Sequence, residues 1–150
     1  MSYLDDVNKI LGGKKDTATK LDKPKPQVKI LIVEDDPSLS EMYSYKFIHE
    51  GFDVTTAPDG QKGLETAISF MPDIILLDLM MPIMDGRQML RKLREIPKFK
   101  KLPVIVVTNA GDIESMKETQ RYENANEFLI KSNVSIDDVV KKVKDWTNLV

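Results

Sequence analysis

The chain has 150 residues, of which 41% are hydrophobic and 31% charged, which is typical of one soluble globular domain. Its longest apolar runs, such as 74–77 and 104–107, are far shorter than the roughly 20 residues that cross a bilayer. A formal net charge of −2 argues against nucleic acid or anionic lipid as a partner. The chain has no cysteine, and its start lacks the features of a secretory signal, so we expect a cytoplasmic protein.

Residues 1–27 differ in composition from the rest of the chain. The segment 12–27 has two glycines, two prolines and one aliphatic residue larger than valine, so it cannot bury enough surface to offset its ordering entropy. We therefore predict a flexible extension over 1–27 and a folded domain over 28–150. Ahead of the segment 12–27, which we call the tether, four apolar residues recur at helical spacing: Leu4, Val7, Ile10 and Leu11. They predict a short amphipathic helix that either docks, on this domain or on a partner, or frays.

From Val28 onward, short apolar runs alternate with segments of helical period, which predicts the order βαβαβαβαβα. The predicted strands cover 28–33, 53–56, 74–77, 104–107 and 127–130. The predicted helices cover 37–50, 60–70, 87–95, 113–123 and 136–149. We expect Asp36 to cap the first helix ahead of Pro37, and Ser135 with Asp138 to cap the last. Three strands are continuous apolar runs, which is typical of a parallel sheet that is buried on both faces.

Polar residues collect directly after four of the predicted strands. They are Glu34, Asp35 and Asp36 after the first strand, Asp78 after the third, Thr108 and Asn109 after the fourth, and Lys131 after the fifth. Because ligands bind beyond the carboxyl ends of parallel strands, we expect these side chains at one sheet edge. Several carboxylates beside one lysine repel one another unless a divalent cation neutralises them. Oxygen ligands favour Mg²⁺ over zinc or copper, and Mg²⁺ sites commonly include phosphate oxygens.

Asp78 follows the most hydrophobic strand, and an aspartate carboxylate can be the nucleophile that accepts a phosphoryl group. In that scheme Mg²⁺ and the Lys131 ammonium neutralise phosphoryl oxygens, while the Thr108 hydroxyl donates a hydrogen bond to a third oxygen. The backbone carbonyl of Met80 is a candidate further metal ligand. The residue types at this edge therefore predict phosphoryl chemistry.

Four motifs carry a family resemblance: ILIVEDD, IILLDLMMPIMDG, VIVVTNAG and FLIKS. In this order, each at a strand end, they resemble the response regulator receiver domain over residues 28–150. The resemblance implies an α/β, doubly wound, flavodoxin-like (βα)5 fold, with a five-stranded parallel sheet in the order 2-1-3-4-5. It implies Asp78 as the phosphoacceptor, and Glu34 with Asp35 as the acidic pair, Asp35 being the direct Mg²⁺ ligand. Thr108 and Lys131 would then bind the phosphoryl group.

The same resemblance implies a function. The chain would be a single-domain response regulator of a two-component phosphorelay, with a histidine kinase or phosphotransfer protein as the donor to Asp78. Phosphorylation would draw Thr108 toward the phosphate and turn Phe128, at the switch aromatic position, inward. The face made by the fourth helix, fifth strand and fifth helix would then change its affinity for a downstream effector protein. We expect no enzymatic activity beyond the chain's own phosphoryl transfer and autodephosphorylation. We also expect no DNA-binding domain, no membrane partner, and a monomer or weak dimer.

Three positions depart from the family pattern. Lys131 is followed by Ser132, where the family commonly has a proline after a cis peptide bond, which leaves the geometry of this loop open. Asn109 replaces a small residue, and it either narrows access to the phosphate or adds a hydrogen bond. Met80 and Ala110 occupy positions that tune hydrolysis of the acyl phosphate, and neither side chain can orient a water molecule. We therefore predict slow autodephosphorylation.

Two alternative functions are weighed against this one. A receiver-like module could bind proteins without phosphorylation, but the intact set of Asp35, Asp78, Thr108 and Lys131 argues against it. A small Mg²⁺-dependent phosphohydrolase would need a second carboxylate two residues after the nucleophile, where Met80 stands. Other features have ordinary structural interpretations: the basic residues of 91–101 as a solvated helix face and loop, the loop methionines as packing, and His49 as exposed.

Overall fold

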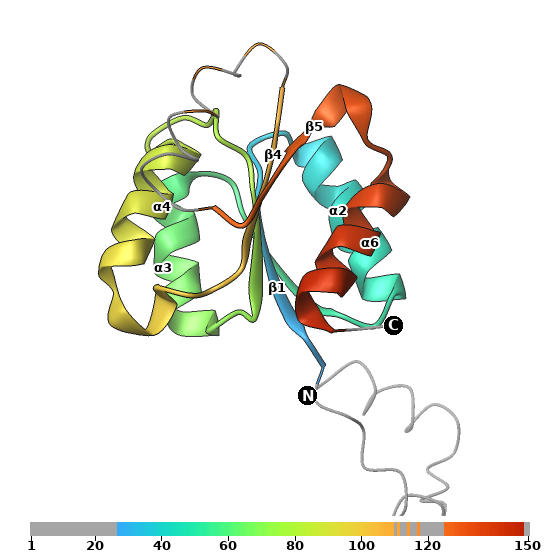
Figure 1. Cartoon of the computed structure of the whole chain (residues 1–150), viewed down its shortest axis with the longest axis horizontal. Coiled ribbons are helices and arrows are strands. Elements are labelled where there is room, and N and C mark those ends of the chain that lie inside the picture. Colours follow the sequence, from blue (N-terminus) through green and yellow to red (C-terminus); the bar gives the residue numbers. More distant parts are fainter. Residues whose placement is uncertain (1–26, 110, 112–113, 115–116, 118–124, 149–150) are drawn as a thin grey trace, which may run out of the picture.

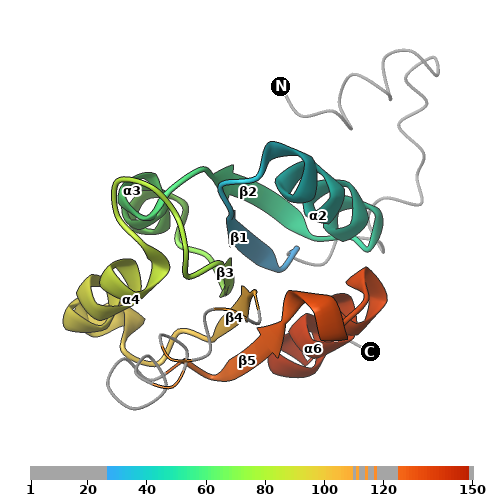
Figure 2. The ribbon, with the colours of Figure 1, turned by 90° about the horizontal axis from the view of Figure 1, so that it is seen from above.

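Five parallel strands form one sheet in the order β2-β1-β3-β4-β5, and Figure 2 shows them side by side in this order. In the computed structural model, which describes residues 27–109, 111, 114, 117 and 125–148, the strands are β1 (Lys29–Val33), β2 (Asp53–Ala57), β3 (Ile74–Leu77), β4 (Val104–Thr108) and β5 (Glu127–Ile130). Each predicted strand is confirmed to within one residue at either end. The predicted order 2-1-3-4-5 and the doubly wound fold are also confirmed.

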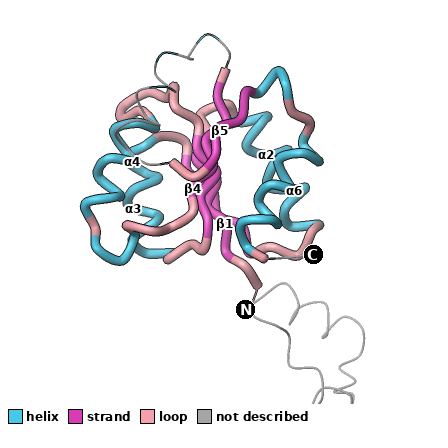
Figure 3. Tube along the Cα trace, viewed as in Figure 1, coloured by secondary structure: helices cyan, strands magenta, loops and turns pink. Residues whose placement is uncertain are grey.

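Helices cover both faces of the sheet. They are α2 (Pro37–His49), α3 (Gly60–Phe70), α4 (Gly86–Glu95) and α6 (Ile136–Thr147), with 3-10 turns η2 (Pro97–Phe99) and η4 (Lys131–Asn133). Figures 1 and 3 show α3 and α4 on one face of the sheet and α2 and α6 on the other. Of the predicted helix over 113–123, residues 114 and 117 are described, both as helical, and the rest lies outside the described residues, as does the amphipathic segment near the start of the chain.

Local capping explains where the helices begin and end. The Asp36 side chain accepts hydrogen bonds from the amides of Ser38 and Leu39 ahead of Pro37 at the start of α2. Ser135 and Asp138 form a reciprocal capping box at the start of α6, as predicted. Helix α6 ends two residues earlier than predicted, because Asn148 adopts a left-handed conformation with φ 57° that stops the helix.

Two apolar cores lie on the two faces of the sheet. Alternate strand residues such as Leu31 and Leu77 pack with α3 and α4, whereas Ile30 and Leu76 pack with α2 and α6. This alternation buries both faces of β3 and explains why its sequence is a continuous apolar run. Within the described part of the chain, no helix combines the length and the apolar character needed to span a bilayer.

The basic stretch 91–101 is not uniformly solvated, which corrects our expectation. Arg94 is half-buried, and its Nη1 donates hydrogen bonds of 2.8 Å to the carbonyl oxygens of Phe99 and Leu102. Its Nη2 donates to Asn126 Oδ1 at 3.3 Å. Because burial removes water from the guanidinium, the pKa of Arg94 is lowered. Arg94 therefore ties the end of α4 to the loops that flank β4.

The loop methionines and His49 mostly follow expectation. Met81 and Met84 are partly buried and pack against the core between the sheet, α3 and α4. Met80 differs from them, because 51% of it is exposed. His49 is exposed at the end of α2, where its ring stacks on Tyr45 with a centroid distance of 6.1 Å.

Candidate functional site

The carboxyl ends of the strands bring three acidic side chains together. Glu34 and Asp35 follow β1, and Asp78 follows β3, which pairs with β1 in a register that aligns Val33 with Leu77. One carboxylate oxygen from each acidic residue lies within 4.8 Å of the others. The backbone holds the two strand ends in place, since the Asp78 amide donates to the Val33 carbonyl at 3.0 Å. The predicted acidic cluster is thus present at one edge of the sheet.

Lys131 lies against this cluster, directly after β5 and within the turn η4. Its Nζ is 2.7 Å from Glu34 Oε1 and 3.2 Å from Asp78 Oδ2. A single ammonium group therefore neutralises part of the charge of two buried carboxylates, and such pairing is what makes buried charge tolerable. All peptide bonds in the described residues are trans, the Lys131–Ser132 bond included.

Burial distinguishes the three carboxylates. Glu34 and Asp78 are buried, whereas Asp35 is exposed. Burial raises the pKa of Glu34 to about 7, even though its hydrogen bond with Lys131 acts in the opposite direction. For Lys131, burial favours the neutral form, but the hydrogen bond to Glu34 and the charge of Asp78 outweigh it and raise its pKa. Glu34 is therefore poised between its charged and neutral forms near neutral pH.

The loop between β3 and α4 holds Asp78 in position through close backbone contacts. The Asp78 Oδ1 accepts a 3.4 Å hydrogen bond from the Met80 amide, and the Gly86 amide donates to the Leu79 carbonyl at 2.8 Å. A Cβ atom on Gly86 would collide with the Asp78 carbonyl oxygen. Only glycine fits at this point, because any side chain would displace the backbone that carries Asp78.

Ile83 at the tip of this loop has an unfavourable backbone conformation. Its φ is 71°, a left-handed value that is costly for a β-branched residue. The side chain is 83% exposed, so packing of Ile83 itself does not compensate for the strain. The Met84 amide donates a 2.8 Å hydrogen bond to the Pro82 carbonyl across Ile83, and the Gly60 amide donates to the Met84 carbonyl at 2.8 Å. These two bonds hold the loop in this shape.

Thr108 and Phe128 lie on the same face of the sheet. Thr108 is fully buried at the end of β4, two residues after Val106, which faces the core of α3 and α4. Because strand side chains alternate, Thr108 faces the same way. Phe128 is aligned with Val106 across β4 and β5, and it is partly buried against that core. Ala110 lies outside the described residues.

The site suits a hard divalent cation by its donor chemistry. Its carboxylates offer oxygen ligands only, and they lie close enough to share one ion. Mg²⁺ prefers oxygen ligands and retains several waters, which the exposed position of Asp35 permits. Lys131 already pairs with Glu34 and Asp78, so an added cation and the ammonium would share the same negative charge.

Sequence reasoning missed one residue whose hydroxyl is influenced by the charges of the site. Tyr43 on α2 is buried in the core between the sheet, α2 and α6, and burial raises the pKa of its hydroxyl. The charges of Lys131, Glu34 and Asp78 also act on it. The apolar spacing of Tyr43 and Phe47 indicates only a core position, so the sequence carries no signal of this electrostatic influence.

Comparison with known proteins finds similar sequences over most of the described domain. The family described as Response regulator receiver domain matches residues 30–144. The DNA-binding dual master transcriptional regulator RpaA of Synechocystis is 31% identical over 116 residues, which cover 77% of this chain and 47% of that protein. The response regulator ArlR of Staphylococcus aureus is 32% identical over 115 residues, which cover 77% of this chain and 50% of that protein. The chain thus matches about half the length of these relatives.

Solved structures show the same fold. The chemotaxis response regulator CheY4 of Vibrio cholerae superposes with a TM-score of 0.72 at 27% identity, covering 80% of this chain and 98% of that one. The receiver domain of the Francisella response regulator 1452 gives a TM-score of 0.71 at 29% identity, covering 80% and 96%. The family match spans most of the sheet and its helices, and the chain belongs to the response regulator receiver domain family of two-component signalling.

Proposed function

We propose that this chain is the phosphoacceptor of a two-component relay and that Asp78 receives the phosphoryl group. The observation that carries the proposal is the convergence of Glu34, Asp35 and Lys131 on Asp78 at one sheet edge. An Asp78 carboxylate oxygen lies within 4.8 Å of both members of the acidic pair, and Asp78 Oδ2 is 3.2 Å from the Lys131 ammonium. Its buried, backbone-anchored position holds the carboxylate in one orientation, which favours attack on an incoming phosphorus atom.

In the proposed reaction, a carboxylate oxygen of Asp78 forms a bond to phosphorus while the bond to a histidine nitrogen of the donor breaks. The freed imidazole takes up a proton from solvent. Mg²⁺ would supply neutralisation of the phosphoryl oxygens when bound, held by Glu34, Asp35, Asp78 and the Met80 carbonyl. Lys131 would move its Nζ from Glu34 to a phosphoryl oxygen. The donor would be a histidine kinase or a histidine phosphotransfer protein.

We further propose that Thr108 and Phe128 transmit the effect of phosphorylation at Asp78 to the surface around β5. The Thr108 hydroxyl would donate a hydrogen bond to the phosphoryl group, and the Phe128 ring would turn inward. Both side chains face the same core, so movement of one changes the space available to the other. The resulting change at the surface around β5 would alter affinity for an effector protein. Met80 and the residue at position 110 would leave hydrolysis of the acyl phosphate slow.

Intact-protein mass spectrometry with a small phosphodonor tests the central step. The native chain should gain one phosphoryl mass only when Mg²⁺ is present, and Asp78→Asn should gain none. Asp73→Asn is a matched control, because Asp73 precedes β3 at the opposite edge of the sheet and the same substitution there should leave the adduct unchanged. If Asp78→Asn still gains the mass, the proposed acceptor is wrong. If neither Mg²⁺ nor phosphate engages the site, a phosphorylation-independent binding module becomes the better account.

A further inference from the structure

Helix α2 is apolar on two faces, which is unusual for a helix at the surface. Its inner face buries Tyr43 and Phe47. Its outer face carries Met42, Tyr45 and Ile48, which are 51%, 72% and 60% exposed. These three residues are spaced by three positions and form one continuous line, which we call the outer stripe. A helix with large apolar residues on its solvent side commonly has a partner for that side.

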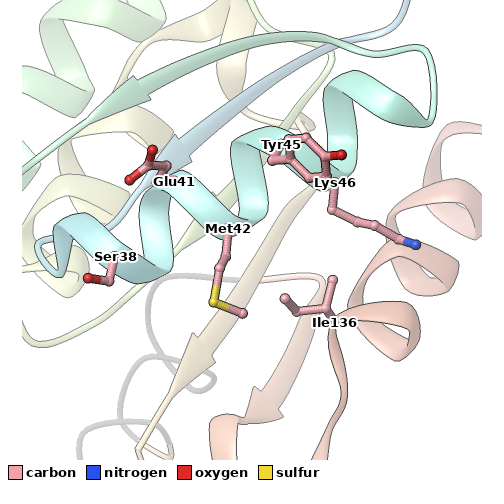
Figure 4. A pocket seen from close by; sticks show the side chains of 6 residues that line it. All are labelled: Ser38, Glu41, Met42, Tyr45, Lys46 and Ile136. Atoms are coloured by element: carbon pink, nitrogen blue, oxygen red, sulfur yellow. The ribbon is translucent and has the colours of Figure 1, made fainter.

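The outer stripe borders a groove between α2 and the start of α6. The groove has a volume of about 530 Å³ and is lined by Ser38, Glu41, Met42, Tyr45, Lys46 and Ile136. Figure 4 shows Met42 and Ile136 pointing toward each other, while Lys46 extends toward α6. Lys46 Nζ lies 3.0 Å from Asp137 Oδ1, so a charged pair stands at the rim of an apolar groove. This arrangement suits the apolar side of an amphipathic helix.

Residues 2–11 of the chain carry a complementary pattern. Their apolar residues are Leu4, Val7, Ile10 and Leu11, which fall on one side of a helix. At a rise of 1.5 Å per residue, Leu4 to Leu11 spans roughly 10 Å, and Met42 to Ile48 spans roughly 9 Å. The two stripes therefore match in length. A helix of about ten residues is marginal in water by itself, so it needs a surface to pack against.

The place where the chain enters the domain makes this surface reachable. The Val28 carbonyl accepts a hydrogen bond from the Asp53 amide, and the Gly51 amide donates to the Ile48 carbonyl at 3.0 Å. The start of β1 and the C-terminal end of α2 thus lie at the same end of the molecule (Figure 1). Residues 12–27 span at most about 50 Å when extended and about 20 Å as a random coil. Helix α2 is itself about 20 Å long.

We propose that residues 2–11 dock on the outer stripe of α2 within the same molecule. The tether keeps the segment at an effective concentration in the millimolar range, so modest apolar contact is enough to populate the docked state. The groove reaches Ser38 and Ile136, at the α2 and α6 ends nearest the acidic edge. A docked segment therefore covers a surface beside the functional site, and a protein that needs this surface must displace it. The docking itself does not depend on phosphorylation.

The absence of cysteine makes a clean test available. A nitroxide label on Ser2→Cys, the only thiol in the 150-residue chain, broadens the amide NMR signals of residues that lie near it. We expect loss of amide intensity at Met42, Tyr45 and Ile48, measured against the reduced, diamagnetic label. Val7→Gln combined with Ile10→Gln should restore these signals. Lys9→Gln is the matched control, because Lys9 falls on the opposite side of the predicted helix, and it should leave the broadening intact.

A mixed sample separates the possible occupants. An isotope-labelled chain without nitroxide is combined with an unlabelled chain that carries it, so any broadening then arises between molecules. If the outer stripe is broadened as much in the mixed sample as in the single-chain sample, a second copy binds there and the proposal is overturned. No broadening in either sample also overturns the proposal, and a different protein then becomes the candidate partner of the outer stripe. Broadening only within one molecule supports the proposal.

Discussion

Replacement of Glu34 by glutamine tests the electrostatics of the acidic edge, because the amide keeps the shape of the side chain and removes its titration. Burial raises the pKa of Glu34 from 4.5 to about 7 in the folded chain, against the opposing effect of its hydrogen bond to Lys131. In the unfolded chain the carboxyl returns to its ordinary value. Between these two values the folded state binds a proton that the unfolded state has released.

By linkage, the ionisation of Glu34 lowers the free energy of unfolding as pH rises through this window, and the full loss is reached above the folded pKa of about 7. Each tenfold change in proton affinity is worth about 1.4 kcal/mol, so the full effect is roughly 3 kcal/mol. Water near the exposed Asp35 screens part of this energy. We therefore expect the native chain to lose about 2 kcal/mol relative to Glu34→Gln between about pH 5 and pH 8.

Urea denaturation of both chains at the two pH values, with a chelator to remove divalent cations, measures this difference. Glu65→Gln is the matched control, because Glu65 is exposed on α3 and should show no comparable change with pH. Added Mg²⁺ should stabilise the native chain more than Glu34→Gln, since the variant has lost one candidate ligand. A free-energy difference between native chain and variant that stays constant with pH would refute the reasoning, because burial would then not govern the ionisation of Glu34.

Three further substitutions test the supporting structure by urea denaturation. Gly86→Ala should cost about 2 kcal/mol or more, because the new Cβ would collide with the Asp78 carbonyl oxygen; an unchanged midpoint would contradict this. Ile83→Gly should raise stability by about 1 kcal/mol, because Ile83 lies at φ 71° in a turn closed by the Met84 amide and the Pro82 carbonyl, which glycine adopts without a Cβ clash, and a loss would contradict the inferred strain. Arg94→Ala should cost about 2 kcal/mol, because it removes the guanidinium donor from the part-buried carbonyl oxygens of Phe99 and Leu102, although the Phe99 oxygen keeps the Leu102 amide as a donor at 3.3 Å. The exposed Lys92→Ala on the same helix is its control and should change stability little.

The fold was predictable from the sequence because its signals are local. The apolar runs of β1, β3 and β4 are continuous because both faces of the sheet are covered, and that composition is visible without coordinates. Asp36 and Ser135 cap helices through backbone groups two or three residues away, so short-range chemistry sets those starts. The helix ends were less predictable, since Asn148 stops α6 by a left-handed conformation that asparagine tolerates but does not require.

The clustering of the site residues was predictable for a topological reason. Parallel strands place their carboxyl ends at one edge, so Glu34, Asp78 and Lys131 had to approach one another once the strand order was known. Their partners within that cluster were not predictable. Whether Lys131 pairs with one carboxylate or two depends on side-chain distances of a few ångströms, which the spacing along the sequence does not contain.

Sequence by itself thus determined the order of strands and helices, the burial of both sheet faces and the edge at which the acidic residues gather, because each depends on periodicity or topology. Only the tertiary structure decided which carboxylate is buried, and therefore that Glu34 has a raised pKa and Asp35 faces water. It also decided that Arg94 turns inward and that α2 keeps a second apolar face exposed. These properties depend on packing between elements that are neighbours in space but distant in the sequence.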